Sequence, residues 1–249
     1  MQKQMLDDPT FSFALQVEYA NTIKRIVSEF RAEVINVLTP HEERELGTYS
    51  KDQSYNPGKL LAGIKNKVSQ RSKEQIVNLI KYQVQHGATL AMRQMKISPL
   101  PKFMGKYINT GTVIELANVN VSLVKSLQQR YLDSLKLLVA RVIGAGTLSW
   151  SSFVKGIKKL GKISNAQAEQ IARTEVVRAV TAGQAEEFKR RGVDTWMWIT
   201  QLDERVCEVC RPLHNKCVRI GDPFVITNKG PIVKPPAHPN CRCGVDTCV

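Results

Sequence analysis

The sequence lacks both a long apolar run and an N-terminal targeting segment. Its most apolar stretch, about residues 135–148, is interrupted by Lys136 and Arg141. The stretch therefore falls short of the roughly 20 apolar residues that cross a bilayer. Residues 1–8 contain neither an apolar core nor a cleavage site, so they do not read as a secretory signal. We expect a protein that is made in a cytosol, with no membrane-spanning helix and no membrane partner.

Cysteine is absent from the first 206 residues. All six cysteines lie in the last 43 positions: Cys207, Cys210, Cys217, Cys241, Cys243 and Cys248. In a reducing cytosol such a cluster more often binds metal than forms disulfides. A chain of 249 residues can bury a core without covalent links, so stability alone does not require these residues. The alternative is two or three disulfides that form after cell lysis.

Five residues near the C-terminus have the spacing of a metal site. Cys207 and Cys210 can offer both sulfurs to one tetrahedral ion if the chain turns between them. A later proline-rich run supplies His238, Cys241 and Cys243. If this run is extended, its two cysteines share one face, and only one of them binds. Our preferred ligand set is Cys207, Cys210, His238 and Cys243, with Cys241 as the substitute.

This ligand set predicts one structural zinc ion per chain. Four protein ligands close the coordination sphere, whereas a catalytic zinc keeps one position open for water. The sequence contains no His-Glu-x-x-His pair, which argues against a hydrolytic zinc centre. The remaining cysteines, Cys217 and Cys248, are expected to be small buried residues outside the site.

Acidic residues are scarce relative to basic ones. The chain has 36 Lys and Arg against 22 Asp and Glu, a net charge of +14, and such a field attracts polyanions. Residues 51–106 hold eleven Lys and Arg but only two acidic residues. We expect non-specific contact with double-stranded DNA there, through Lys65, Lys67, Arg71 and Lys73. The alternative is a solvated helix face, because the segment has few aromatic side chains to stack on bases.

Apolar periodicity predicts helices over the first three quarters of the chain. They cover residues 13–37 before Pro40, 72–97, 113–143, 151–160 and 165–191. A capping box at Ser164-Asn-Ala-Gln167 opens the last of them. Strand patterns follow at 195–200, 217–220, 224–227 and 241–245. The predicted fold class is α+β, with long N-terminal helices followed by a small β-rich C-terminal zinc-binding unit.

This organisation predicts two domains. Residues 1–108 would be a helical, basic attachment region, and residues 109–249 would contain the zinc site at 207–243. The long helices each carry one apolar stripe, and such stripes need a partner surface. We expect the first helix to dock on another protein. The alternative is that the helices pack on one another as a monomeric bundle.

Four segments of the C-terminal part occur in a recognisable order. They are Ala172-Arg-Thr-Glu175, Trp196-Met-Trp198, Asp203 to Cys210, and Pro235 to Cys243. With this order and spacing, residues 110–249 resemble the protein F-like minor head proteins of tailed bacteriophages, a head morphogenesis family typified by phage Mu. The chain departs from the family pattern after Cys210, where a glycine-containing turn is usual.

The resemblance implies a minor head protein that is part of the virion and lies inside the head near the portal. It implies a role in head assembly and in DNA packaging or ejection, contacts with the portal protein and other head proteins, presence in the host cytoplasm during assembly, and no enzymatic activity. Two other classes compete with this interpretation: a zinc-dependent or ADP-ribosyltransferase-like enzyme, and a zinc-containing DNA-binding regulator. An enzyme needs an open metal position or a convergent acid and base, and a regulator needs a base-reading recognition helix. Neither pattern stands out in the sequence.

The remaining residues of these segments are expected to be structural. Arg173 and Glu175 would anchor their helix to the β-rich unit through an ion pair that includes Arg178. A catalytic Arg/Glu pair is the alternative. The other expected structural residues are Trp196 and Trp198, in the core beneath the cysteine pair, and Asp203, which would cap the turn leading into it.

Overall fold

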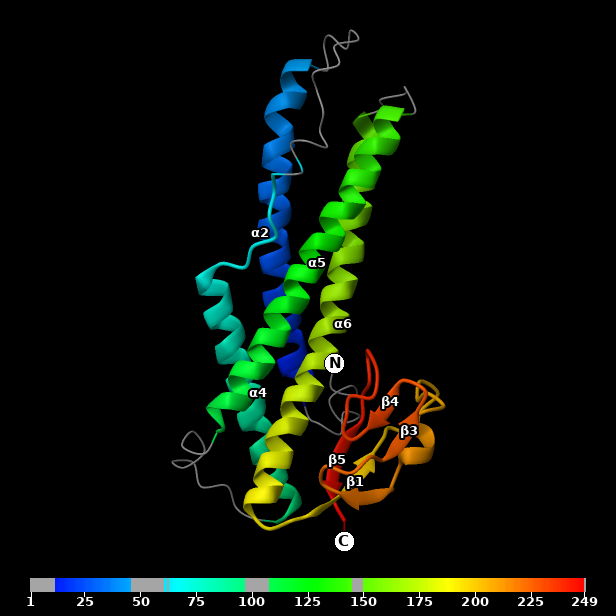
Figure 1. The fold of residues 1–249 in the computed structure, drawn as a ribbon. Helices are drawn as coiled ribbons and strands as arrows, with labels where there is room; N and C mark the ends of the chain where they lie inside the picture. The colour runs from blue at the N-terminus through cyan, green and yellow to red at the C-terminus, as the bar shows by residue number, and fades with distance from the viewer. Residues whose placement is uncertain (1–11, 46–60, 62, 97–107, 145–149, 249) are drawn as a thin grey trace. The chain divides into compact units, whose positions relative to one another are not determined.

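A computed structural model of the chain describes residues 12–45, 61, 63–96, 108–144 and 150–248. The long helices come first in chain order: α2 (Phe13–Glu45), α4 (Gln70–Gln94), α5 (Thr110–Gly144) and α6 (Trp150–Arg190). Short strands follow from Thr195 onward (Figure 1). The predicted α+β class is therefore confirmed. No helix in the described ranges is long and apolar enough to span a membrane.

Two of the predicted helix boundaries are wrong. α2 continues through Pro40 to Glu45, because a proline removes one backbone donor without obliging the helix to end there. α6 is one continuous helix where the sequence pattern predicts two, and Ser164 lies inside it. The Ser164 hydroxyl donates to the Leu160 carbonyl at 3.0 Å, a bond that satisfies the side chain within a helix and removes the need for a cap.

The strands form two small sheets. β1 (Thr195–Ile199) is the central strand of the first, between β2 (Cys217–Arg219) and β5 (Gly244–Thr247), and both pairings are antiparallel. β3 (Val225–Thr227) and β4 (Gly230–Ile232) form a separate hairpin. The cysteine-rich segments are therefore the connections around a three-stranded sheet.

Two features of these sheets differ from the prediction. The last strand begins at Gly244, after both cysteines of the Cys-x-Cys run, and not at Cys241. β4 has no counterpart among the predicted strands, because its three residues include a glycine and a proline, which are depleted in strands. β4 is a strand because it pairs with β3 in the hairpin, although its own sequence does not favour a strand.

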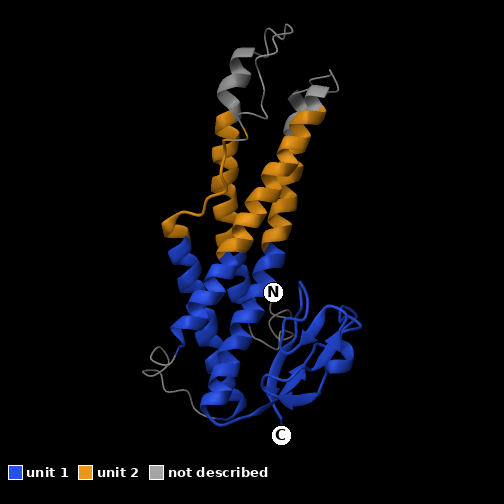
Figure 2. Cartoon of the chain, viewed as in Figure 1, with its two compact units in different colours: residues 1–20, 73–120, 169–249 blue, residues 21–72, 121–168 orange. Residues whose placement is uncertain are grey.

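The chain divides into two compact units (Figure 2). Unit 1 contains residues 1–20, 73–120 and 169–249, and unit 2 contains residues 21–72 and 121–168. Each unit draws on both sides of the boundary predicted between residues 108 and 109. The packing units are therefore not the predicted domains, whose division into an attachment region and a head morphogenesis region stays a prediction.

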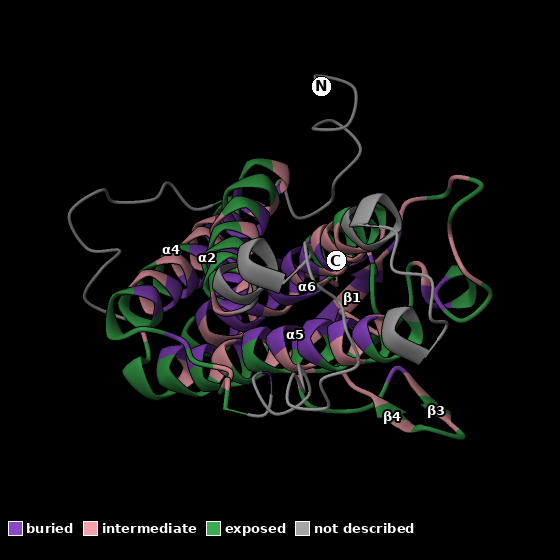
Figure 3. Ribbon diagram, turned by 90° about the horizontal axis from the view of Figure 1, so that it is seen from above, coloured by how far each residue is buried: buried purple, intermediate pink, exposed green. Residues whose placement is uncertain are grey.

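An apolar cluster from the helices and from Leu61 holds unit 2 together. Its buried members are Phe30, Val34, Leu61, Tyr131, Leu132, Leu135 and Val139. Ile157 and Leu160 of α6 pack against them. Figure 3 shows buried and exposed residues alternating along each of the long helices. The apolar stripe of α2 is therefore buried within this chain, as in the packed-bundle alternative, and docking of this helix on another protein stays a prediction.

In unit 1, α4 and α6 cross with their backbones in direct contact. A β-carbon added to Gly87 would lie 2.0 Å from the carbonyl oxygen of Val180. One added to Gly183 would lie 2.0 Å from the carbonyl oxygen of Val84. Each helix therefore places a carbonyl group where the other helix has no side chain, and only glycine fits at either position.

The last strand is tied to both of these helices. The Val245 carbonyl accepts hydrogen bonds from Gln94 at 2.7 Å and from Gln184 at 3.1 Å, and Gln184 also donates to the Gln94 side chain at 3.0 Å. A second apolar cluster surrounds this contact. Its buried members are Ala91, Phe188, Trp196, Trp198, Cys210, Leu213, Phe224, Cys241, Cys243 and Val245. The cysteine-rich region is thus packed on α4 and α6 within unit 1.

Candidate metal centre

A tight turn brings the sulfurs of the first cysteine pair together. The backbone N–H of Cys210 donates to the carbonyl of Cys207 at 3.2 Å and to its Sγ at 3.3 Å. The backbone N–H of Arg211 donates to the same carbonyl at 3.0 Å, and a short 3-10 helix, Arg211–Leu213, follows. The Cys-x-x-Cys spacing therefore has the turn that two ligands of one ion require.

His238 reaches this turn from the proline-rich run. Its Nε2 lies 3.1 Å from the Sγ of Cys207 and 3.3 Å from the Sγ of Cys210. Its Nδ1 lies 2.8 Å from the carbonyl oxygen of Pro239, a contact that places a proton on Nδ1. The backbone N–H of Cys241 donates to the His238 carbonyl at 3.1 Å and closes the loop. Nε2 is therefore the nitrogen that can bind a metal ion.

Cys241 and Cys243 complete the cluster. Both are buried, and their sulfurs form a group with the sulfur of Cys210 in which all atoms lie within 4.8 Å of one another. Cys207, Cys210 and His238 form a second group by the same measure, so Cys210 belongs to both. The expectation that Cys241 and Cys243 sit on one face of a strand is wrong, because β5 begins after them. The structure brings all five candidate ligands together.

Hydrogen bonds shift the pKa values of Cys207, Cys210 and Cys241 in different directions. Bonds from Cys210 and then Cys243 lower the pKa of Cys241, assisted by backbone N–H groups of Cys243 and Ala237. The contact with Cys241 raises the pKa of Cys210. Burial opposes ionisation of Cys207, but hydrogen bonds from Cys210 and the nearby His238 lower its pKa overall. Each half of the site therefore has one thiol that favours the thiolate form, Cys207 and Cys241.

The donor set fits a metal ion that prefers sulfur and nitrogen. In a tetrahedral zinc site with bonds of about 2.0 to 2.3 Å, the ligand atoms lie roughly 3.5 to 3.8 Å apart. The two groups gather their donor atoms on that scale. Thiolate and imidazole are also the ligands that select zinc over magnesium or calcium. The side chains of this chain can therefore hold a metal ion.

Arg242, between Cys241 and Cys243, joins the two halves of the site. Its guanidinium donates to both carboxylate oxygens of Asp203, at 2.6 and 2.7 Å, and to the side chain of Gln201 at 3.0 Å. Asp203 also accepts the backbone N–H of Arg205 at 3.1 Å at the start of the turn. The hydrogen bond from Arg242 is the main cause that lowers the pKa of Asp203. No local sequence pattern indicates this role, because Arg242 and Asp203 are 39 residues apart.

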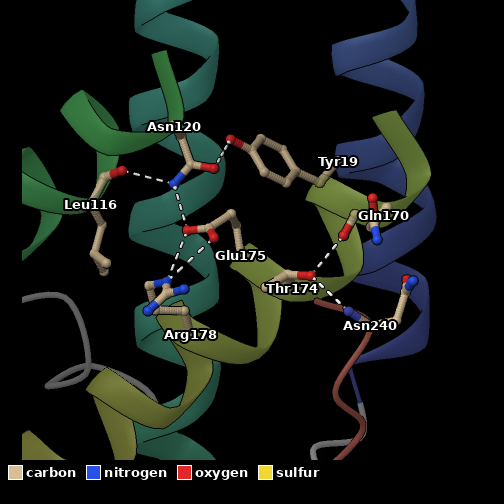
Figure 4. A network of polar contacts seen from close by, with 8 residues as sticks. All are labelled: Tyr19, Leu116, Asn120, Gln170, Thr174, Glu175, Arg178 and Asn240. Atoms are coloured by element: carbon tan, nitrogen blue, oxygen red, sulfur yellow. Dashed lines mark hydrogen bonds and ion pairs between the residues drawn. The ribbon is translucent and has the colours of Figure 1, made fainter. Parts of the chain in front are cut away.

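The α6 turn at Thr174 holds the loop that carries His238 (Figure 4). Asn240 has a φ of 62°, and its backbone N–H donates to the Thr174 hydroxyl at 3.1 Å. Arg173 donates to the side-chain oxygen of Asn240 at 3.2 Å. The Thr174 hydroxyl in turn donates to the Gln170 carbonyl at 2.8 Å. Arg173 therefore contacts the β-rich unit through Asn240 and not through an ion pair.

Glu175 faces other helices of unit 1. Its side chain is buried and forms an ion pair with Arg178 at 3.1 Å on the same helix. Asn120 of α5 donates to Glu175 at 3.5 Å and accepts from the Tyr19 hydroxyl of α2 at 2.6 Å (Figure 4). Burial, followed by the charge of Glu175, raises the pKa of Tyr19. The network gives a buried carboxylate the partners that its burial requires.

Cys217 and Cys248 form a disulfide, so the prediction of two small buried thiols is wrong. Cys217 begins β2 and Cys248 follows β5, and these are the outer strands on either side of β1. The order of strands in the sheet, which no local pattern reveals, brings the two residues together. The four cysteines that remain free are those of the two metal-type groups.

The two predicted core tryptophans lie in the apolar cluster that includes Cys210, Cys241 and Cys243. Trp196 and Trp198 point to the same side of β1 and are both buried. The centroid of the Phe224 ring lies 5.1 Å from that of Trp198 and 6.1 Å from that of Trp196. The three aromatic rings therefore pack in the same apolar cluster as the buried cysteines.

The four lysines and arginines assigned to DNA contact are all exposed: Lys65, Lys67, Arg71 and Lys73. In unit 2, Asn66 donates to the Lys125 carbonyl of α5 at 3.1 Å, and Gln128 donates to the Lys67 carbonyl at 3.2 Å. The segment around Asn66 therefore lies along α5 while its lysines extend into solvent. Their contact with DNA stays a prediction.

One comparison with known proteins gives a family. Residues 133–246 match the family model described as "Phage Mu protein F like protein". A protein of Haemophilus influenzae named "Uncharacterized protein" is 29% identical over 140 residues, which cover 54% of this chain and 30% of that protein. The match therefore spans less than a third of the length of that relative. No solved structure matches this chain. The matched residues include all five candidate ligands and the α6 turn that holds their loop. Over residues 133–246 the chain is therefore similar to the phage Mu protein F-like family.

Proposed function

We propose that this chain is a minor head protein of a tailed bacteriophage, positioned inside the head near the portal. In this role it contacts the portal protein and other head proteins, assembles in the host cytoplasm, and aids packaging or ejection of DNA. The observation that carries the proposal is the family match over the segment that contains the whole Cys/His cluster.

The metal of this cluster is proposed to be a structural zinc ion, one per chain. Cys207, Cys210 and His238 are three of the proposed ligands, and either Cys243, which the spacing favours, or Cys241 is the fourth. The sulfurs of Cys241 and Cys243 both lie within 4.8 Å of the Sγ of Cys210. A bound zinc would link the Cys-x-x-Cys turn to the proline-rich loop, and four protein ligands would leave no position for a substrate water.

The proposed role is not enzymatic. In an ADP-ribosyltransferase-like or hydrolytic enzyme, Arg173 and Glu175 would have to converge on a substrate. Instead, Arg173 binds Asn240 of the metal loop, and Glu175 is buried with Arg178 and Asn120 as partners. The two side chains serve different contacts on different sides of α6, which supports structural roles for both.

Non-specific contact with double-stranded DNA is part of the proposal. The net charge of +14 and the exposed side chains of Lys65, Lys67, Arg71 and Lys73 support it. Binding of this kind arises from phosphate contacts and counterion release, so it weakens steeply as salt is added.

Mass spectrometry of purified heads, compared with shells assembled without the portal protein, tests the proposed location. We expect the chain in complete heads at few copies and its loss from portal-free shells. Equal amounts in both would contradict a position near the portal, and absence from complete heads would contradict a virion protein altogether. A zinc determination on the same purified protein tests the cofactor independently of location.

A further inference from the structure

One face of the first half of α6 carries a stripe of lysines. Lys155, Lys158, Lys159 and Lys162 are spaced at i, i+3, i+4 and i+7, which places them on the same side of the helix. All four are exposed. With a rise of 1.5 Å per residue, the stripe is about 10 Å long. It presents four positive charges along two turns of one helix.

The side of α6 opposite the lysine stripe packs against the core of unit 2 and so keeps the stripe facing solvent. Ile157 and Leu160 pack against the apolar cluster of unit 2, and Ser164 is buried. A β-carbon at Gly156 would meet the Leu138 side chain at 2.7 Å, which places this part of α6 close against α5. Because these residues hold one side of the helix on the core, the lysines are held toward solvent.

The charge of the stripe is not balanced by its own segment of sequence. Residues 121–168 contain eight Lys and Arg and a single acidic residue, Asp133. The Asp133 carboxylate accepts a hydrogen bond from Gln129 at 2.8 Å. The guanidinium of Arg31 lies beside the stripe, where it donates to the Gly161 carbonyl at 2.9 Å. The missing side chain at Gly161 thus admits a further positive charge to this region.

We propose that the lysine stripe of α6, Lys155, Lys158, Lys159 and Lys162, is a binding site for the phosphate backbone of double-stranded DNA. This inference rests on the proposed DNA contact but assigns it to a different surface from Lys65, Lys67, Arg71 and Lys73. Double-stranded DNA carries one negative charge per roughly 1.7 Å of its axis, so a stripe of this length can face several phosphates at once. Lysines are point charges, and they contact phosphates without reading bases.

The composition of the stripe favours duplex DNA over two other polyanionic partners. Binding of single strands uses aromatic side chains that stack on bases, and residues 155–168 contain none. A protein partner needs an apolar centre within the contact, and Ile163 is the exposed large hydrophobic residue that this part of α6 offers. A rigid helix with four charges on one face is sufficient for phosphate contact alone.

The test measures binding of the full-length, metal-loaded chain to a fluorescently labelled duplex at several salt concentrations. In the stripe variant, Lys155, Lys158, Lys159 and Lys162 are all changed to Gln, which keeps similar helix propensity. We expect affinity at about 0.1 M salt to fall roughly 10- to 100-fold, and the slope of log K against log salt to flatten by about 3 to 4. Circular dichroism and metal content should match the wild type.

A matched variant controls for net charge. It changes Lys189, Arg211, Arg219 and Lys229, four exposed residues of unit 1, to Gln and so removes the same charge. We expect this variant to keep most of the salt slope. Equal losses in the two variants would reduce the effect to net charge and overturn the inference, as would a stripe variant that binds like the wild type.

A third variant separates this inference from the proposed function. If changing Lys65, Lys67, Arg71 and Lys73 to Gln removes the salt slope while the stripe variant retains it, the DNA contact stands and the stripe is overturned. If the wild-type chain does not bind duplex at all, both fail. If the stripe variant binds DNA normally but no longer enters heads, the stripe binds an acidic protein surface and the inference is wrong.

Discussion

The two units of this chain are specified in different ways. Most of the described buried polar side chains lie in unit 1, and among them Asn120, Thr174, Glu175 and Gln184 have individual partners. Unit 2 buries an apolar cluster, and its residues include seventeen Lys and Arg against seven Asp and Glu. Polar partners fix direction and distance, whereas apolar contacts fix mainly volume. The difference indicates that the unit with the metal ligands needs exact geometry, and that the other unit needs a stable base for its charges.

Glycines express the same contrast. In unit 1, an added β-carbon at Gly87 or Gly183 would meet a backbone carbonyl oxygen at 2.0 Å. In unit 2, one at Gly156 would meet the methyl end of Leu138 at 2.7 Å, and one at Gly161 would meet the end of Arg31 at 3.0 Å. Backbone cannot move aside without shifting a helix, but the end of a side chain can change rotamer.

Removal of the metal should give the largest effect and should affect unit 1 alone. Zinc binding in small structural modules corresponds to about 10 kcal/mol or more of folding free energy. Cys207→Ser or Cys210→Ser should therefore lose the metal and disorder the packing around Trp196 and Trp198. The near-ultraviolet circular dichroism of the tryptophans would disappear, while the helical signal of unit 2 persists.

The matched control for these variants is Cys217→Ser, which breaks the disulfide but leaves the candidate ligands intact. It should retain one metal ion per chain. A purified wild-type protein that contains no metal and still shows an ordered tryptophan spectrum would contradict the metal centre.

Gly183→Ala should follow as the next largest effect. Because the new methyl group meets backbone, we expect a loss of about 2 to 4 kcal/mol in the free energy of unfolding, measured with urea. Gly156→Ala makes the same chemical change in unit 2 and should cost about 1 kcal/mol or less, since Leu138 can rotate and alanine favours a helix. Equal costs at the two positions would remove the contrast between the units.

Thr174→Val should loosen the metal loop without unfolding it. The change removes the acceptor for the Asn240 backbone N–H, and we expect transfer of the metal to a chelator to become about tenfold faster, a difference of about 1.4 kcal/mol. Thr174→Ser keeps the hydroxyl and should restore the wild-type rate. Thr181→Val is the matched control on the same helix, because the buried Thr181 hydroxyl has no hydrogen-bond partner among the described atoms. A similar acceleration in both valine variants would exclude a specific role for Thr174.

Asp203→Asn should give the smallest effect, about 1 kcal/mol at neutral pH, because the pair with Arg242 is partly exposed. The pKa of Asp203 is lowered in the folded chain, so the contribution of its charge is complete above the ordinary value of about 4. It is lost only as pH falls through the lowered value. The difference between wild type and variant should therefore be constant from pH 8 to pH 5. A difference that disappears near pH 6 would assign it to another group.

The clustering of the candidate metal ligands was predictable because short spacing in the sequence encodes it. Cys207 and Cys210 are separated by a single turn, and the prolines around His238 restrict the loop on the other side. The contacts that hold these ligands in place were not predictable. Arg242 and Asp203 are 39 residues apart and come together where β1 pairs with β5. Thr174 and Asn240 are 66 apart, so their contact depends on how the loop packs on α6.

The helices show the same limit. Periodicity located each long helix, because the spacing of buried residues is a property of the helix itself. The prediction of helix ends failed at two residues. Ser164 lies inside α6, where its hydroxyl bonds to the Leu160 carbonyl, and α2 continues through Pro40 despite the low helix propensity of proline. The disulfide between Cys217 and Cys248 depends on the order of strands in the sheet, which the spacing of cysteines does not contain.

The Val245 carbonyl, which accepts from both Gln94 and Gln184, has a mechanical consequence. Once the Cys217–Cys248 disulfide is reduced, a pull on Cys248 loads β5 directly, and there two amides from separate helices resist it at one atom, beside the ladder to β1. Because both bonds end on the same oxygen, they share the force and rupture together. The strand should then detach in one step at a single threshold, and it should not peel away residue by residue.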